Sequence, residues 1–483
     1  MAVPEQVAIV GGGIAGLSTA FALVERAGET GKPLRCTVLE GHSAFGGKIV
    51  TNHVQGLIVE GGPDSFLTTK PSALALCDRL GLTSQLLNTS QGDGRALTYS
   101  RGRLREFPQG LIAMVPTQPG SLFRSGVMSW AGIVRMGAEW WVPVRRETDG
   151  EETMAGFFSR RLGAEAFHRL IEPFVAGIYA GDANELSVDA TFPQFLEWER
   201  RHGSLIKGAL AMRRARATQG QGTTATRTLF ASLRGGLGDL ITRLSDRLSD
   251  AGVSLRRGAT VLAVRSPRET RPGHPYQLEL EGGTTVEADA VVLATPAYVS
   301  AGLLHSVDRE SATLLDQIPY ASTITISMAY AEPEIGNRLR GYGFVVPRIE
   351  NRGLIAATWS SMKWAGRAPS GQCLIRCYLG GRGREDLLEL DDADLTNHAC
   401  RELDAMAGIR GRPFHVEVYR WPRAMPQYVC GHRDRVRRIR QCVARHPGLY
   451  LTGAAYDGLG IPDCIRDAGN TAQSLSEFLW PSS

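Results

Sequence analysis

Residues 6–25 read QVAIVGGGIAGLSTAFALVE, in which three consecutive glycines separate two apolar segments. The first segment, residues 7–10, consists of small and branched apolar residues and predicts a strand buried in a sheet that is covered on both faces. In the second segment, apolar residues recur at three- and four-residue steps, which predicts an amphipathic helix with one buried face: Ile14, Leu17, Phe21 and Val24. The stretch therefore predicts a strand, a tight turn and a helix, as in an α/β fold.

The glycines of this turn follow the spacing G-x-G-x-x-G, with Gly11, Gly13 and Gly16 at the defining positions. In a dinucleotide-binding turn, the first glycine permits the tight bend, the second lets a pyrophosphate approach the backbone, and the third lets the helix pack closely on the strand. The N-terminus of the helix also presents free N–H groups to an anion. The pattern favours dinucleotide binding over the alternative, a strand–helix unit whose glycines serve packing alone.

A second apolar strand, RCTVLE at residues 35–40, ends in a carboxylate. Glu40 is placed to accept hydrogen bonds from both ribose hydroxyls of a bound adenosine. The stretch of chain from Gly16 to Glu40 is longer than the usual spacing, and we expect residues 25–33, ERAGETGKP, to form a surface loop that absorbs the excess.

The 483 residues include 43% hydrophobic residues and carry a net charge of +5, which indicates a globular chain of about three domains. Positive charge is concentrated at RRAR (213–216) and HRDRVRRIR (432–440). Neither cluster is interleaved with stacking aromatic residues, so we interpret both as solvated surfaces and expect no nucleic-acid partner. Attraction to an anionic membrane surface stays open as a lesser alternative.

The cysteines and histidines point to no disulfide framework and no metal site. Eight cysteines are scattered singly without a C-x-x-C pair, and the first apolar run is the strand rather than a secretory leader. We therefore expect reduced thiols and a cytoplasmic protein. The ten histidines show no metal-binding spacing. No uncharged apolar stretch reaches the ~20 residues needed to span a bilayer.

The order of the remaining segments predicts three parts, the first of them discontinuous. The segment GLGDLITRLSDRLSDAG predicts an amphipathic helix, and YQLELEGGTTVEADAVVLATP predicts a hairpin that turns at Gly282–Gly283. A last helix has Pro462 in its first turn, with a buried stripe at Ile465, Ala468, Ala472, Leu475 and Leu479. The expected parts are a nucleotide-binding domain at residues 1–90, 231–300 and 420–483, a mostly helical domain at 91–230, and a domain with a separate sheet at 301–419.

The residues that follow Glu40 narrow the choice of dinucleotide. Residues 41–71, GHSAFGGKIVTNHVQGLIVEGGPDSFLTTKP, resemble the stretch after the ribose carboxylate in the large FAD family of amine oxidases and porphyrinogen oxidases. Lys48 stands where many members have arginine, which keeps the charge but not bidentate phosphate contact. In that family the helix that begins near Gly460 points its N-terminus at the pyrimidine side of the flavin, where about half a positive charge favours the reduced cofactor.

Three further stretches are more specific: EPFVAGIYAGDANELSVDATFP (172–193), RWPRAMPQY (420–428) and GAAYDGLGIPDCIRDAG (453–469). They resemble the protoporphyrinogen/coproporphyrinogen III oxidase family, in order and over essentially the whole chain. The resemblance implies a Rossmann-like FAD domain, a mixed-sheet substrate domain and a helical domain that rests on the bilayer in membrane-associated members. It also implies removal of six electrons from a porphyrinogen in three steps, with FAD reoxidised by dioxygen to give hydrogen peroxide.

The resemblance implies site residues as well. No catalytic acid or nucleophile is expected, because the substrate carbon passes hydride directly to the flavin. Arg95 falls where the family places a basic residue for a propionate, although an ordinary exposed arginine is equally compatible. Pocket walls are expected at Gly177, Phe344, Val346 and Trp364, which could equally be core residues. FAD contacts are expected at Gly11, Gly12, Gly13, Ile14, Ala15, Gly16, Glu40, Gly41, Lys48, Gly62, Pro63, Asp64, Ser65, Val261, Trp421, Leu459, Gly460 and Ile461.

Several questions stay open at this point. Residues 111–144, with Phe123, Trp130, Trp140 and Trp141, could lie against lipid headgroups as a peripheral membrane contact, or pack within the helical domain. The sequence does not separate protoporphyrinogen IX from coproporphyrinogen III, or a monomer from a homodimer. Alternatives to a porphyrinogen oxidase are another enzyme of the amine oxidase or desaturase type and a flavin-binding module without turnover.

Overall fold

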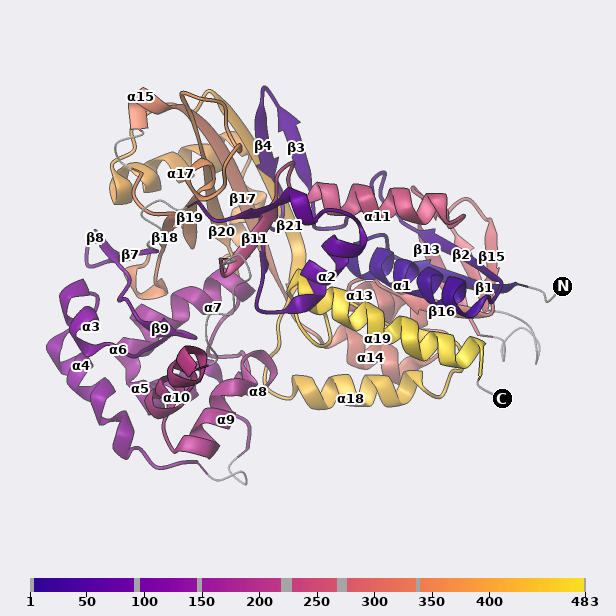
Figure 1. Ribbon diagram of the computed structural model, residues 1–483, viewed down its shortest axis with the longest axis horizontal. Coiled ribbons are helices and arrows are strands. Elements are labelled where there is room, and N and C mark those ends of the chain that lie inside the picture. The colour runs from indigo at the N-terminus through magenta and orange to yellow at the C-terminus, as the bar shows by residue number, and fades with distance from the viewer. Residues whose placement is uncertain are drawn as a thin grey trace.

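The computed structural model describes residues 4–90, 96–145, 150–218, 228–266, 276–335 and 339–481. Figure 1 shows three units. One is built on a parallel sheet and holds both ends of the chain, one is built on a larger sheet, and one is made of helices. The α/β fold class expected from the sequence is confirmed.

The first unit is built on a five-stranded sheet in the order β12-β2-β1-β16-β22, and all of its strand pairs are parallel. Alternate residues of β1 point to opposite faces, so Val7 and Ile9 lie in one core and Ala8 and Val10 in the other. The strands are β1 (Glu5–Val10), β2 (Leu34–Leu39), β12 (Ser254–Arg256), β16 (Ala290–Leu293) and β22 (Leu449–Leu451).

Both faces of this sheet are covered, as the apolar strands predict. One face packs against α1 (Ile14–Thr30), α2 (Pro71–Arg79), α11 (Gly238–Asp250) and α19 (Ile461–Leu479). The other packs against the antiparallel sheet of β13 (Val261–Arg265), β14 (Tyr276–Leu280) and β15 (Thr285–Ala288), and against α13 (Ala297–Leu304), α14 (Arg309–Asp316) and α18 (His432–Val443). The predicted hairpin and the buried stripe of α19 are confirmed.

The expected surface loop at residues 25–33 is wrong. Helix α1 continues to Thr30 and ends at Gly31, which has the left-handed conformation that suits a helix C-cap (φ 64°). Residues Glu25–Ala27 are good helix formers, so the excess length extends the helix rather than a loop.

Short strands and turns connect the first unit to the others. They are β3 (Thr51–Val54), β4 (Leu57–Glu60), β5 (Phe66–Leu67), β6 (Leu86–Asn88), β11 (Phe230–Leu233) and the turn η1 (Thr83–Gln85).

The second unit has a seven-stranded sheet in the order β21-β17-β20-β19-β18-β7-β8. Helix α17 (Asp392–Ala407) covers one face, against Ile375 and Cys377 of β20. On the opposite face of the same strand, Arg376 lies buried toward the first unit. The strands are β7 (Leu97–Ser100), β8 (Arg103–Glu106), β17 (Tyr320–Ala331), β18 (Gly343–Val345), β19 (Ala356–Trp359), β20 (Gln372–Gly380) and β21 (His415–Pro426), with short helices α15 (Glu332–Ile335), η6 (Arg348–Glu350), α16 (Ser360–Lys363) and η7 (Glu385–Glu389).

The third unit consists mainly of helices around an aromatic core that includes Phe157, Phe158 and Phe195. Its elements are β9 (Leu111–Ile112), β10 (Val115–Pro116), α3 (Pro119–Ser125), α4 (Trp130–Gly137), η2 (Ala138–Trp141), α5 (Met154–Leu162), α6 (Ala164–Ala166), η4 (Phe167–Ile171), α7 (Glu172–Tyr179), α8 (Val188–Thr191), α9 (Pro193–His202) and α10 (Leu205–Thr218). The domain boundaries stay predictions, but β7 and β8 take part of the segment 91–230 into the second sheet.

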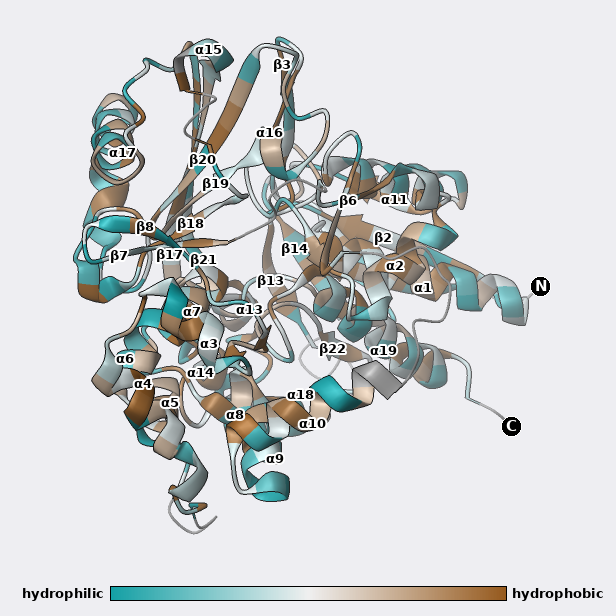
Figure 2. Ribbon diagram, turned by 60° about the vertical axis from the view of Figure 1, so that its left-hand side comes forward, coloured by the Kyte–Doolittle hydropathy of each residue, from teal (hydrophilic) through white to brown (hydrophobic). Residues whose placement is uncertain are grey.

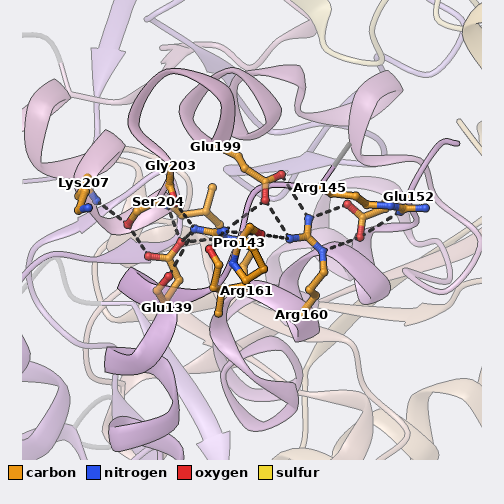
Figure 3. Close-up of polar contacts among 12 residues, drawn as sticks. Glu139, Pro143, Arg145, Glu152, Arg160, Arg161, Glu199, Gly203, Ser204 and Lys207 are labelled. Carbon is orange, nitrogen blue, oxygen red and sulfur yellow. Dashed lines mark hydrogen bonds and ion pairs between the residues drawn. The ribbon is translucent and has the colours of Figure 1, made fainter. Parts of the chain in front are cut away.

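A buried ion network fixes η2 in the helical unit (Figure 3). The Glu139 carboxylate accepts hydrogen bonds from Arg161 Nε at 2.8 Å and from the Leu205 backbone N–H at 2.7 Å, and both charged side chains are fully buried. Arg160 binds Glu152 and Glu199 in the same network. Removing one partner of such a buried pair costs about 3–5 kcal/mol, so this turn is held firmly.

Candidate active site

The glycines between β1 and α1 differ in what surrounds them. A Cβ at Gly16 would lie 1.9 Å from the Gly11 carbonyl oxygen, and one at Gly11 (φ 108°) would lie 2.8 Å from the Ala294 carbonyl oxygen. At Gly13 the nearest atom would be Gly47 Cα, 4.0 Å away. Gly11 and Gly16 are therefore required by packing, whereas the space beside Gly13 is open to a ligand.

Glu40 connects the glycine turn to the end of β2. Its buried carboxylate accepts hydrogen bonds from the Gly12 N–H at 2.7 Å and the His42 N–H at 2.8 Å. The His42 ring lies 2.9 Å from the same carboxylate. Glu40 thus positions the turn as well as offering the carboxylate that the ribose contact requires; the ribose contact itself stays a prediction.

The segment before β13 lies against Glu40 and Gly41. The Glu40 N–H donates to the Arg256 carbonyl oxygen at 2.9 Å, and the Ala259 N–H donates to the Glu40 carbonyl oxygen at 2.8 Å. This pairing brings Thr260 to the side of Gly41, and the next residue, Val261, is 8% exposed. The arrangement suits the expected adenosine end of the cofactor.

Two helices of the first unit pack against each other. Helices α1 and α19 lie side by side (Figure 1), and a Cβ at Gly453, which follows β22, would lie 3.9 Å from Ala15 Cβ in the first turn of α1. Their N-caps, Gly13 and Gly460, make no side-chain cap, whereas Asp308 caps α14. Free N–H groups and the positive ends of the two helix dipoles are therefore available to an anionic ligand.

The loop Gly61–Ser65 is held by the second sheet. The Gly61 carbonyl oxygen accepts hydrogen bonds from Thr325 Oγ1 at 2.8 Å, Trp421 Nε1 at 3.0 Å and Arg376 Nη2 at 3.2 Å. Sequence reasoning singled out Trp421 but missed Thr325 and Arg376. Both lie inside long strands, and no local motif marks them.

Asp64 links this loop to α16. Its carboxylate lies 2.9 Å from Lys363 Nζ and accepts a hydrogen bond from Trp364 Nε1 at 3.0 Å. Burial raises the pKa of Asp64, but the charges of Lys363 and Arg376 and the hydrogen bonds lower it by more. The pKa of Asp64 therefore lies well below its usual range. The Trp364 side chain is fully buried, and its role as a substrate wall stays a prediction.

Lys48 lies between the two glycine-containing loops. Its Nζ donates to the Ala424 carbonyl oxygen, and its own carbonyl oxygen would lie 1.7 Å from a Cβ at Gly62. Burial lowers the pKa of Lys48 to about 8, opposed in part by the neighbouring Cys464 thiol in the first turn of α19. The phosphate contact expected of Lys48 stays a prediction.

The predicted substrate walls lie in different surroundings. On α7, a Cβ added at Gly177 would have no atom within 4 Å, and the neighbouring Ile178 is 46% exposed, although the opposite face of the helix is buried. Phe344 and Val346 lie within the core of the second unit. Arg95 lies outside the described residues. Ile178 was not singled out from the sequence, although it adjoins Gly177 in the same motif.

At the start of α7, Glu172 is almost entirely buried. Burial raises its pKa to about 7, opposed by the backbone N–H and the charge of Arg348.

Among the described residues, no group of three or more potential metal ligands is found.

Comparison with known proteins identifies the class. The family described as flavin containing amine oxidoreductase matches residues 14–476. The chain belongs to this family, and it is an FAD-dependent oxidoreductase. The open space at Gly13, the two uncapped helix N-termini and Glu40 fit an adenine dinucleotide.

Within this class, the chain is similar to porphyrinogen oxidases. Coproporphyrinogen III oxidase of Bacillus subtilis (strain 168) is 35% identical over 471 residues, which cover 97% of each chain. The chloroplastic protoporphyrinogen oxidase of Oryza sativa subsp. japonica is 30% identical, over 98% of this chain and 88% of the relative. A crystal structure from Exiguobacterium sp. 255-15, provisionally named a protoporphyrinogen oxidase, has a TM-score of 0.85 and 30% identity, covering 98% of this chain and 99% of that one.

Proposed function

We propose that this chain oxidises a porphyrinogen to the porphyrin in haem biosynthesis, with coproporphyrinogen III as the preferred substrate and dioxygen as the electron acceptor. The observation that carries the proposal is the exposed apolar face of α7, where Gly177 and Ile178 border open space. Burial and the charge of Asp463 raise the pKa of Tyr179, which places this end of α7 near the first turn of α19. A flat apolar macrocycle fits a glycine-bearing surface at that position.

The chain's own part in the reaction is to bind and orient. FAD, when bound, takes up two electrons at a time, so a six-electron oxidation needs three turnovers. The surface of Gly177 and Ile178 would hold the macrocycle and exclude water, while the clamped Gly61–Ser65 loop and the start of α19 would fix the cofactor. No side-chain acid or base is required of the protein.

Sequence identity supports coproporphyrinogen III over protoporphyrinogen IX. Coproporphyrinogen III oxidases of Bacillus subtilis and Propionibacterium freudenreichii are 35% and 34% identical to this chain, whereas that of Staphylococcus aureus and the rice protoporphyrinogen oxidase are both 30% identical. A comparison of kcat/KM for the two porphyrinogens tests this choice, and a higher value for protoporphyrinogen IX would reverse it.

Anaerobic mixing tests the reaction itself. Porphyrinogen should bleach the absorbance of the bound flavin, and under air about three equivalents of hydrogen peroxide should form per porphyrin, because each two-electron step ends on dioxygen. Bleaching by an amine but not by a porphyrinogen would instead favour an amine oxidase. No bleaching by either would favour a binding module.

A substitution in α7 tests the placement of the substrate. Gly177→Val fills the open space and should lower kcat/KM at least tenfold with an unchanged flavin spectrum, since a tenfold loss corresponds to about 1.4 kcal/mol. Gly28→Val is the matched control, because Gly28 is an exposed helical glycine of α1 that also has no neighbour within 4 Å. Equal kinetics of the two variants would exclude Gly177 from the substrate site.

We also propose a peripheral membrane contact through the tryptophan surface, defined as Phe123, Trp130, Val134, Trp140 and Trp141. Trp141 is 82% exposed and Trp130 68% exposed, while the buried Glu139 fixes the turn that presents Trp140 and Trp141. Lys207 Nζ lies 5.2 Å from the Trp140 ring centroid, which adds a cation. Hydrophobic colour lies on α4 at the outer edge of the helical unit (Figure 2), an arrangement typical of an interfacial anchor.

Vesicle sedimentation tests this contact. The protein should bind vesicles that contain phosphatidylglycerol, and the double variant Trp130→Ser/Trp141→Ser should bind at least tenfold more weakly. Phe478→Ser is the control, because Phe478 is a 41% exposed apolar residue of α19 outside the tryptophan surface. Equal binding by parent and double variant would exclude the surface as an anchor. No helix of the described residues is long and apolar enough to cross a membrane.

A further inference from the structure

Arg376 is a buried cation with two nitrogens that have no hydrogen-bond partner. Its side chain is 2% exposed, and only Nη2 donates hydrogen bonds, to the carbonyl oxygens of Gly61 and Gly62. Nε and Nη1 are buried without a hydrogen-bond partner, and the guanidinium lies 5.0 Å from the Tyr378 ring centroid. None of the ion pairs found among the described residues includes Arg376.

Arg376 shares its nearby carboxylates with other cations. The Glu60 carboxylate lies 3.5 Å from Arg367 Nη2, and the Asp64 carboxylate lies 2.9 Å from Lys363 Nζ. Both carboxylates also interact with the charge of Arg376, and Asp239 adds a negative charge near Arg367, so Arg376 is compensated without a direct ion pair. A negative charge that develops near this buried guanidinium would therefore be stabilised.

The position of Arg376 identifies the source of that charge. Its hydrogen bonds end on Gly61 and Gly62, the start of the loop expected to contact the flavin. A flavin that accepts two electrons and one proton gains one negative charge. The oxidised flavin ring is neutral, so a nearby cation stabilises the reduced form selectively.

We propose that Arg376 is a positioning residue that holds Gly61–Gly62 and places a buried positive charge behind this loop, so that it raises the reduction potential of the bound flavin. The proposal rests on the placement of FAD within the proposed function. Arg376 is then a second source of positive potential at the flavin, besides the N-terminus of α19, and it comes from a different unit of the chain.

Two substitutions at Arg376 separate charge from shape. Arg376→Gln removes the charge but keeps a donor for the loop carbonyls, whereas Arg376→Lys keeps the charge. In the holoenzyme, equilibrated with a reference dye at pH 7, Arg376→Gln should shift the ratio of oxidised to reduced flavin at least tenfold toward the oxidised form. A tenfold shift is about 30 mV for a two-electron couple. Arg376→Lys should restore most of the parent potential.

Thr325→Val is the matched control for loop position. It removes a hydrogen bond to the same Gly61 carbonyl oxygen without changing any charge. The ratio of oxidised to reduced flavin should therefore stay within threefold of the parent ratio. A potential that falls equally in Thr325→Val and Arg376→Gln would overturn the proposal, because loop position alone would explain the shift. A parent-like potential in Arg376→Gln would also overturn it.

Asp64→Asn supplies an independent test if Arg376→Gln does not retain FAD. It removes a negative charge from the same cluster at constant shape, so the potential should rise rather than fall. A fall or no change would overturn the proposed electrostatic effect of this cluster on the flavin. None of these measurements uses a porphyrinogen, so a chain that fails to oxidise porphyrinogens refutes the proposed function without affecting this test.

Discussion

The two glycine-containing loops of the site are held in place in different ways. Gly11–Gly16 is fixed by its own neighbours: the Gly12 N–H donates to Glu40, only 28 residues away, and Gly16 packs on the Gly11 carbonyl oxygen. Gly61–Ser65 is fixed by Thr325, Arg376 and Trp421, whose hydrogen bonds to Gly61 span 264, 315 and 360 residues. The first loop is a local motif, whereas the second forms only when two units of the chain have docked.

The largest expected effect contrasts two positions of the first loop. Gly16→Ala places a Cβ 1.9 Å from the Gly11 carbonyl oxygen, so the FAD-free chain should lose most of its folded population. Gly13→Ala has room and an ordinary backbone conformation (φ −75°), so the FAD-free melting temperature should change little. FAD should nevertheless bind at least tenfold more weakly, because the methyl group enters the space for the pyrophosphate.

Thermal melting of the FAD-free chains and fluorescence titration with FAD measure the two effects separately. Similar melting temperatures for Gly16→Ala and Gly13→Ala would contradict the division between a packing glycine and a ligand-facing glycine.

This contrast also explains how much of the site the sequence could predict. The turn at Gly11, the carboxylate of Glu40 and the start of α19 were predicted because each is encoded by a short stretch with its own periodicity. Thr325 and Arg376 could not be predicted, since their role depends on which strand faces are turned toward Gly61. The residues of β20 that flank Arg376 are apolar and lie under α17, so the local sequence indicates only a buried strand.

A substitution at α16 probes the second loop through Asp64. Lys363→Met removes the ion pair at 2.9 Å and leaves a mostly buried carboxylate whose hydrogen-bond donors are neutral, with the charge of Arg376 still acting on it. The chain should lose about 3–5 kcal/mol of stability, and the pKa of Asp64 should rise. Chemical unfolding measures the loss. The control is Arg201→Met, which breaks an exposed ion pair with Glu197 on α9 and should have almost no effect.

A smaller effect is expected at the ribose end of the first loop. Glu40→Ala should weaken FAD binding by about 1.5–3 kcal/mol, the range for hydrogen bonds to a charged group. It also removes the acceptor of the Gly12 N–H, so the FAD-free chain should melt at a slightly lower temperature. Glu40→Gln keeps an acceptor and should recover part of both losses. Full retention of FAD by Glu40→Ala in dilute solution would remove Glu40 from the ribose.

The smallest expected effect concerns Lys48, whose segment joins the two loops: Gly46 pairs with Gly13, and the Lys48 carbonyl oxygen faces Gly62. Burial lowers the pKa of Lys48 from 10.5 to about 8, so the unfolded chain binds more protons than the folded chain between these values. Stability from this group is therefore fully present above pH 10.5 and is lost as the pH falls through 8. Between pH 7 and 9.5, the parent should gain about 1–2 kcal/mol relative to Lys48→Met.

The FAD-free chain is the right material for this measurement, because a bound anion would raise the pKa of Lys48 and flatten the difference. Unfolding of parent and Lys48→Met is compared at pH 7, 8.25 and 9.5, and the same series is repeated with saturating FAD. Loss of the pH-dependent difference on adding FAD would place the negative charge of the cofactor beside Lys48, between the two loops. A difference that is unchanged by FAD would show that Lys48 stays remote from the cofactor and serves only to hold the segment to Ala424.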